Sequence, residues 1–257
     1  MATINQHAPG SFCWIELATS DQNAGKQFYA DLMGWTITDN PMGEAGTYTM
    51  FELGGRSTGG AYTLMADEAA LGIPPHWNLY VSVTSADETA ARAAGLGGKV
   101  LVGPFDVMTH GRMAVLQDPT GAVINLWEPK EHHGVCVAGE AGALCWADLS
   151  SPDQAAATAF YTGLFGYEMV PGDGGYLHIQ NGETMIGGVQ SADMRNPHVP
   201  AHWLIYLQVD DCDASTAKAQ SMGAQVHFGP ITLDKVGRFS VLADPQGAVF
   251  ALFQPAE

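Results

Sequence analysis

The chain carries the same order of motifs in each of its two halves, and this repeat restricts the fold more than any other feature. Residues 12–17 (FCWIEL) match residues 144–149 (LCWADL), and later motifs return at slightly shorter offsets, as short loop deletions would produce. The sequence therefore predicts two homologous domains, 1–130 and 142–257, joined by a polar, glycine-bearing linker at 131–141. The other repeated motifs are Phe28-Tyr29 with Phe160-Tyr161, His76-Trp77 with His202-Trp203, Gly111-Arg112 with Gly237-Arg238, and Asp118-Pro119-Thr120-Gly121 with Asp244-Pro245-Gln246-Gly247.

Within each half, the hydrophobic pattern predicts two modules of the order strand–helix–strand–strand–strand. Residues 12–18 alternate as a strand does, and residues 22–33 place apolar side chains at helical spacing. Four such βαβββ modules give the fold class α+β, with mixed sheets that curl around a central space in each half. The remaining strands of the first half are expected near 47–53, 58–64, 78–83, 99–102, 112–117 and 122–128.

Polar residues mark the expected helix starts. Ser20 or Asp21 can cap the first helix, and Ser151 is predicted to cap its copy, with Pro152 at the first helical position. Ser85 and Glu88 form a predicted capping box, in which Glu88 reaches back to the first backbone amides.

The composition excludes several function classes. With 10 Lys+Arg against 27 Asp+Glu, the net charge of −17 argues against binding nucleic acid or an anionic membrane. No apolar run reaches the roughly 18 residues that a membrane helix needs, and the N-terminus lacks the pattern of a signal peptide. We therefore expect a cytoplasmic protein with reduced cysteines, as a monomer or homodimer whose partner is a small molecule.

The motif Phe28-Tyr29-x-x-Leu32-x-Gly34-Trp35, its copy at 160–167 and the two Gly-Arg…Asp-Pro-x-Gly segments resemble the vicinal oxygen chelate superfamily. This family includes glyoxalases, bleomycin-resistance proteins and extradiol dioxygenases. The tryptophan followed two residues later by an acid resembles the tandem 27-kDa-antigen-like or hydroxylase-like branch. The resemblance implies two glyoxalase-like domains, each with a cupped mixed sheet and a ligand pocket.

The resemblance also implies metal ligands, and this chain lacks them. The family's ligand positions fall on Trp14, Asn78 and Asn125 in the first half, and on Trp146, Leu204 and Ala251 in the second. Tryptophan, leucine and alanine do not coordinate a divalent cation, and asparagine is a weak neutral ligand. We therefore expect no metal cofactor. A metal held by a non-standard set such as Glu16, Glu52 and His76 is the alternative.

Strand alternation indicates which side chains share the pocket face, because residues two apart on a strand point the same way. Each pocket should then hold a carboxylate, a histidine, a tyrosine and at least one tryptophan, which suits a small organic ligand that is planar or cationic. The predicted ligand-binding residues are Trp14, Asn78, Tyr80, Asn125, Trp127, Trp146 and Tyr206, and the candidate catalytic residues are Glu16, Asp148, His76 and His202.

Two functions follow as hypotheses. The first is a metal-independent, glyoxalase-like protein that binds a small organic molecule in one or both halves. The alternative is a lyase, isomerase or hydroxylase-type oxidoreductase that uses Glu16 or Asp148 as general base and His76 or His202 as proton donor. Arg112 and Arg238 are expected to pair with nearby acids, and His132 and His133 in the linker to be exposed to solvent.

Overall fold

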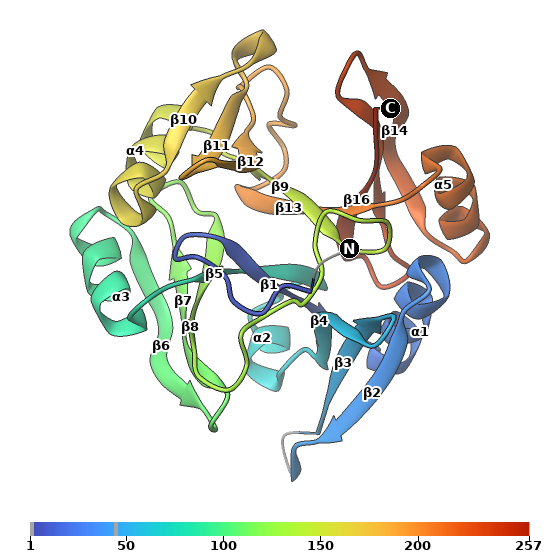
Figure 1. Ribbon diagram of the computed structural model, residues 1–257, viewed down its shortest axis with the longest axis horizontal. Coiled ribbons are helices and arrows are strands. Elements are labelled where there is room, and N and C mark those ends of the chain that lie inside the picture. The colour runs from blue at the N-terminus through green and yellow to red at the C-terminus, as the bar shows by residue number, and fades with distance from the viewer. Residues whose placement is uncertain (1–2, 44–45, 257) are drawn as a thin grey trace.

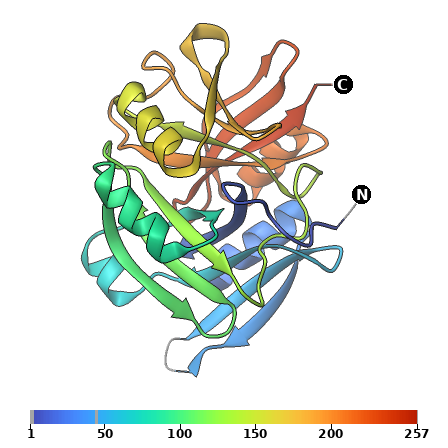
Figure 2. The same cartoon turned by 60° about the vertical axis from the view of Figure 1, so that its left-hand side comes forward.

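The computed structural model describes residues 3–43 and 46–256. The two halves of the chain build one eight-stranded mixed sheet each, and the two sheets are stacked on one another (Figure 1, Figure 2). Within the described residues, domain 1 contains β1 (Phe12–Thr19), α1 (Gln22–Met33), β2 (Thr36–Pro41), β3 (Thr47–Leu53), β4 (Arg56–Thr63), α2 (Ala66–Ala70), β5 (His76–Ser82), α3 (Ala86–Gly95), β6 (Lys99–Val107), β7 (Gly111–Gln117) and β8 (Val123–Pro129).

Domain 2 repeats this order. It contains β9 (Leu144–Ser150), α4 (Gln154–Phe165), β10 (Glu168–Pro171), η2 (Asp173–Gly175), β11 (Leu177–Asn181), β12 (Thr184–Val189), β13 (His202–Gln208), α5 (Cys212–Ser221), β14 (Gln225–Leu233), β15 (Gly237–Ala243) and β16 (Val249–Pro255). The α+β class and the four βαβββ modules are therefore confirmed. The strands β2 and β10, for which the sequence analysis gave no residues, complete the first module of each domain.

The strand order is the same in both sheets, and it places the first strands of the two modules side by side at the centre. In domain 1 the order is β2-β3-β4-β1-β5-β8-β7-β6, and in domain 2 it is β10-β11-β12-β9-β13-β16-β15-β14. The central pair β1–β5 is antiparallel, while β1–β4 and β5–β8 are parallel. The strands that carry the predicted pocket residues are therefore neighbours.

Helix capping decides between the two caps predicted for the first helix and corrects the cap predicted for its copy. Asp21 caps α1, because its side chain accepts from the Ala24 amide at 3.0 Å. Its copy Asp153, rather than Ser151, caps α4 in the same way, so the helix begins two residues later than Pro152. The Ser151 hydroxyl instead accepts from the Asp153 amide at 3.1 Å and shapes the turn before the helix.

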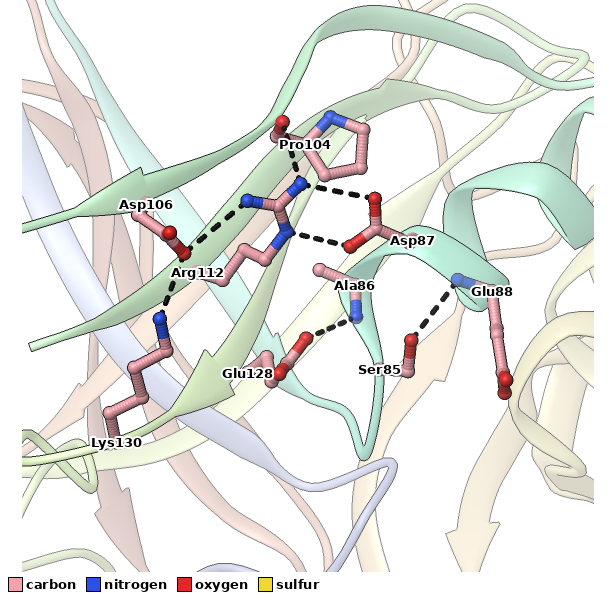
Figure 3. A network of polar contacts seen from close by, with 9 residues as sticks. All are labelled: Ser85, Ala86, Asp87, Glu88, Pro104, Asp106, Arg112, Glu128 and Lys130. Carbon is pink, nitrogen blue, oxygen red and sulfur yellow. Dashed lines mark hydrogen bonds and ion pairs between the residues drawn. The ribbon is translucent and has the colours of Figure 1, made fainter.

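At the start of α3, Ser85 Oγ accepts from the Glu88 amide at 3.2 Å, which is one half of the predicted capping box. The other half is not formed among the described hydrogen bonds. Glu128 of β8 accepts from the Ala86 amide at 2.9 Å instead (Figure 3). The last strand of the module thus satisfies a helix-end amide that the sequence assigned to Glu88.

One hydrophobic core runs through both domains. The inner faces of the central strands pack against the helices and the opposite domain, and α1 contacts α5 while α3 contacts α4. Polar ties reinforce this contact: Tyr29 Oη accepts from Trp77 Nε1 at 2.9 Å and donates to Asp244 of the other domain at 3.1 Å. Trp35 Nε1 donates to the Gly142 carbonyl at 2.6 Å. The two domains therefore share one buried interior.

Among the described residues, no helix is both long enough and apolar enough to cross a membrane. The longest helices, α1 and α4, have 12 residues each.

Candidate functional site

The face of each sheet that lies opposite the shared core is here called its cup face. On β1 and β5, Ile15, Leu17 and Leu79 belong to the shared core, so the alternate residues face the other way. The residues that meet on the cup face of domain 1 include Trp14, Glu16, Asn78, Tyr80, Asn125 and Trp127. The strand alternation therefore predicted the face correctly.

In domain 1, Glu16 is buried on the cup face and surrounded by tyrosines. Tyr80 Oη donates to Glu16 Oε2 at 2.8 Å. Tyr48, on β3, lies beside the carboxylate and also accepts from Trp14 Nε1 at 3.1 Å. Tyr62, on β4, extends this group by donating to Glu68 at 3.0 Å. The carboxylate therefore accepts from phenol hydroxyls rather than from an arginine or a histidine.

Domain 2 builds the same arrangement around Asp148. Tyr206 Oη donates to Asp148 Oδ2 at 2.8 Å, and Tyr176 Oη donates to Oδ1 at 2.6 Å. Trp146 Nε1 donates to Oδ1 at 3.0 Å and approaches Tyr176 Oη at 2.9 Å. Both carboxylate oxygens thus accept from aromatic side chains of the protein itself. We call each carboxylate with its tyrosines and tryptophan a carboxylate cage.

The sequence analysis missed the second tyrosine of each cage. Tyr48 and Tyr176 were not among the predicted site residues, although they stand at the same distance before the Gly59-Gly60 and Gly187-Gly188 pairs. That repeat was a usable signal. The tight fit explains the glycine pairs, because a Cβ on Gly60 or Gly188 would overlap the hydroxyl of Tyr48 or Tyr176.

Burial changes the proton affinity of both carboxylates. Loss of water raises the pKa of Glu16 and of Asp148, while the phenol hydrogen bonds oppose that rise. The same burial, together with the neighbouring carboxylate, raises the pKa of Tyr80 and Tyr206 far above its ordinary value. Each cage therefore retains its phenol protons and has a carboxyl that is less acidic than one in water.

The positions where the family places metal ligands carry amide, aromatic and aliphatic side chains. Asn125 Nδ2 donates to Asn78 Oδ1 at 3.1 Å, whereas Asn125 Oδ1 is buried without a partner among the described residues. In domain 2, Leu204 and Ala251 join an apolar cluster with Trp146. Nowhere in residues 3–43 and 46–256 do three or more His, Cys, Asp or Glu side chains gather as metal ligands would, so the set of Glu16, Glu52 and His76 is not assembled.

The two predicted proton donors hydrogen-bond to backbone carbonyls rather than to the carboxylates. His76 Nδ1 lies 2.8 Å from the Pro74 carbonyl oxygen, and His202 Nδ1 lies 2.9 Å from that of Pro200. Within the part of the chain that the structure describes, neither imidazole hydrogen-bonds to Glu16 or Asp148. In domain 2 another histidine lies nearer: the His178 ring is edge-on to Tyr176 at 5.0 Å and to Trp146 at 6.1 Å.

The linker covers the cup face of domain 1, which corrects the expectation that His132 is exposed. The Val135 amide donates to the Cys13 carbonyl at 2.7 Å, and the Val135 side chain is buried against Trp14 and Trp127. The N-terminal segment lies over the linker, since the Ile4 amide donates to the Cys136 carbonyl at 2.9 Å (Figure 2).

His132 itself is inserted among the tryptophans. Its ring lies edge-on to Trp14 at 4.6 Å and to Trp127 at 5.9 Å, and its backbone carbonyl accepts from Trp127 Nε1 at 2.8 Å. Its Nε2 atom is buried without a partner among the described residues. Burial, and then the nearby His110, His133 and His7, lower the pKa of His132 to about 4. His133 is exposed, as expected.

The cup face of domain 2 is less covered. Its apolar cluster consists only of residues from β9, β13, β15 and β16, with no linker residue among them. Cys145, Trp146 and Phe253 are partly exposed, whereas their counterparts Cys13, Trp14 and Trp127 are 0%, 5% and 8% exposed. The aromatic surface that domain 1 buries under the linker is therefore partly open in domain 2.

The two arginines of the repeated Gly-Arg motif do not belong to either cup face. Arg112 pairs with Asp87 at 2.6 Å and with Asp106 at 3.3 Å, and Lys130 joins Asp106 at 2.9 Å (Figure 3). Arg238 pairs with Asp213 at 2.6 Å in the same way. The prediction that both arginines pair with acids is confirmed.

A separate hollow of about 480 Å³ lies at the start of α1. Its lining is mostly polar and shares no residue with either carboxylate cage. The lining residues are Ser20, Asp21, Gln22, Asn23, Lys26, Asp39, Gly46, Thr47 and Thr63.

The chain is similar to known proteins over nearly its whole length. The profile of the "Glyoxalase/Bleomycin resistance protein/Dioxygenase superfamily" matches residues 11–126 and 143–252. "Putative glyoxylase CFP32" of Mycobacterium tuberculosis is 38% identical over 262 residues, covering 100% of this chain and 99% of that protein. "Anthracycline biosynthesis protein DnrV" of Streptomyces peucetius is 31% identical over 269 residues, covering 99% and 96%.

Solved structures share the fold at low sequence identity. The Mn(II)-bound glyoxalase from Novosphingobium aromaticivorans superposes with a TM-score of 0.67 at 16% identity, covering 97% of this chain and 83% of that one. The 2,3-dioxygenase LapB from Pseudomonas sp. KL28 superposes with a TM-score of 0.63 at 14% identity, covering 100% and 94%. At this identity the likeness concerns the fold alone.

Proposed function

This chain belongs to the Glyoxalase/Bleomycin resistance protein/Dioxygenase superfamily, and we propose that it binds a small organic molecule on a cup face without a metal ion. Its setting is proposed to be the cytoplasm, because Cys13, Cys136, Cys145 and Cys212 are all free thiols.

The observation that carries the proposal is that uncharged amide, aromatic and aliphatic side chains stand at the family's ligand positions. Asn78 and Asn125 bond to each other, and Leu204 and Ala251 pack as hydrocarbon. Trp14 and Trp146 donate their indole protons to tyrosine or carboxylate oxygens. A divalent cation needs charged or strongly basic ligands, and these positions supply none.

The chemistry of the cup face favours a planar ligand over a cationic one. Both oxygens of Asp148 already accept from aromatic side chains of the protein, so three of about four lone-pair sites of the carboxylate are in use before any ligand binds. The surrounding aromatic rings favour a flat apolar molecule. A 31% identical relative is named for anthracycline biosynthesis, and anthracyclines contain such a flat ring system.

Metal analysis and ligand binding test the proposal together. After dialysis against Zn, Fe, Mn and Ni, untagged protein should retain less than about a tenth of an equivalent of each metal. Quinizarin, a planar dihydroxyanthraquinone, should quench tryptophan fluorescence saturably and raise the melting temperature, whereas a planar organic cation of similar size should bind more weakly. One tightly held metal per chain, or no binding of any planar probe, would contradict the proposal.

An enzymatic role for the same site is the rival, and burial of the carboxylates favours it. A carboxylate with a raised pKa is a stronger base than one in water, and burial raises the pKa of both Glu16 and Asp148. Assays should use the hemithioacetal of methylglyoxal and glutathione, and catechol. Turnover that disappears in Asp148→Asn or Glu16→Gln, while quinizarin still binds, would establish the enzyme.

A further inference from the structure

We propose that the two cup faces have separate roles: domain 2 presents the ligand site, for a neutral planar aromatic molecule, and the linker occupies the equivalent site of domain 1 as a plug. The plug is the segment 132–136. This assignment rests on the proposed ligand-binding function and adds to it the domain that holds the ligand and the segment that closes the other site.

The plug is fitted closely to the first sheet. The Val135 and Cys136 amides donate to the Cys13 and Ser57 carbonyls, each at 2.7 Å. Gly134 has φ +106°, and a Cβ at this position would overlap the Cys13 carbonyl oxygen, so only glycine permits this approach. The plug is therefore held by backbone hydrogen bonds and close packing.

The plug also shows what kind of group the cup face accepts. It places the flat imidazole ring of His132 edge-on against Trp14 and near Trp127. Edge-to-face contact of this kind is the favoured geometry between aromatic rings. A planar ring is thus already accommodated by the tryptophans of domain 1, supplied by the chain itself.

Domain 2 offers a similar aromatic surface without a linker residue upon it. Trp146 stands in place of Trp14, and Phe253 in place of Trp127, and both remain partly exposed. Phe239 stands where domain 1 has Met113, which enlarges the aromatic surface. Three aromatic side chains already donate to Asp148, so the carboxylate does not depend on a cationic partner, and the aromatic surface favours a neutral ligand.

A matched pair of substitutions tests the assignment to domain 2. Phe239→Ala should weaken quinizarin binding by about tenfold, the scale expected for losing one aromatic contact. Met113→Ala, its partly buried counterpart in domain 1, should change the dissociation constant less than about twofold. The melting temperatures of the two variants should lie within a few degrees of each other, so that a difference in binding does not reflect a difference in folding.

A second variant tests the plug by a gain of binding. His132→Gly combined with Val135→Gly should raise the stoichiometry from one quinizarin per chain to two, measured by titration calorimetry or native mass spectrometry. His133→Gly, which changes the exposed neighbouring residue, should leave the stoichiometry at one quinizarin per chain.

The outcomes separate this inference from the proposed function. Two equivalents bound by the unmodified chain, or binding weakened by Met113→Ala but not by Phe239→Ala, would overturn the division of roles while ligand binding stands. Absence of binding by the unmodified chain would overturn both. If the double glycine variant fails to fold, the Phe239/Met113 pair decides the question.

Discussion

Trp14 and Trp146 occupy the same position in the first strand of the two domains, and both donate an indole proton within a carboxylate cage. Only Trp14 is covered: it is 5% exposed beneath the linker, while Trp146 stays partly exposed. The cage arises from alternation within each sheet and was duplicated with it. The cover comes from a segment outside the repeat. Duplicated residues therefore reveal the shared scaffold, and the unduplicated segment distinguishes the two sites.

The largest expected effect compares the two tryptophans directly. Trp14→Ala should lower the free energy of unfolding by about 3–5 kcal/mol, because it removes a buried ring from beneath the plug. Trp146→Ala should cost about 2 kcal/mol, because its ring is only partly withdrawn from water. Urea denaturation of both variants measures the difference. Equal losses would mean that the linker does not distinguish the two cup faces.

Acid should destabilise domain 1 through the plug. The pKa of His132 is about 4 in the folded protein and near 6.5 in the unfolded chain. Between these values the unfolded state binds a proton that the folded state does not, so stability falls as pH falls from about 6.5 to about 4. The full loss is about 3 kcal/mol for this group.

His132→Phe should remove that part of the pH dependence while keeping a flat ring against Trp14. His133→Phe, at the exposed neighbouring position, should leave it in place. Urea unfolding at a series of pH values provides the measurement. Superimposable profiles for the unmodified chain and His132→Phe would show that the imidazole is not buried in the folded protein.

Equivalent substitutions in the two carboxylate cages should lower the free energy of unfolding by similar amounts. The cages would then be alike in the two domains, whereas only the cup face of domain 1 is covered by the plug. Tyr80→Phe and Tyr206→Phe each remove one donor from a buried carboxylate and should each cost about 1–3 kcal/mol. The comparison is made by chemical denaturation at neutral pH. If one of the two substitutions leaves the free energy of unfolding unchanged, the carboxylate in that domain has another donor. The two domains would then differ in their cages as well as in how far their cup faces are covered.

The smallest effect concerns the helices that follow the first strands. Asp21→Ala and Asp153→Ala remove equivalent N-caps and should each cost about 1 kcal/mol. Ser20→Ala is the control for the first, since Asp21 carries the cap. A clear difference between Asp21→Ala and Asp153→Ala would show that the two domains differ on their helical side as well.

Local patterns in the sequence predicted much of the scaffold. The repeat gave the four modules, and strand alternation placed Glu16 with Tyr80 and Asp148 with Tyr206 on one face. Alternation is a property of neighbouring residues, so it can be read without knowing what the strand packs against. The roles of these residues in binding or catalysis stay predictions. The predicted cap at Ser151 was wrong. Ser151 and Asp153 are both polar residues that can cap a helix, and the local sequence does not show which of them does.

By itself, the sequence determined that the chain forms two homologous α+β domains, each with a carboxylate and a tyrosine facing the same way. That the family's metal ligands are replaced stays a prediction. Only the tertiary structure decided that Tyr48 and Tyr176 complete the cages, and that His76 and His202 hydrogen-bond to backbone carbonyls instead of the carboxylates. It also decided that His132 is inserted between tryptophans. The reason is physical. Contacts between segments distant in sequence depend on the three-dimensional path of the chain. A polar linker has the same sequence pattern whether it is solvated or folded onto a sheet.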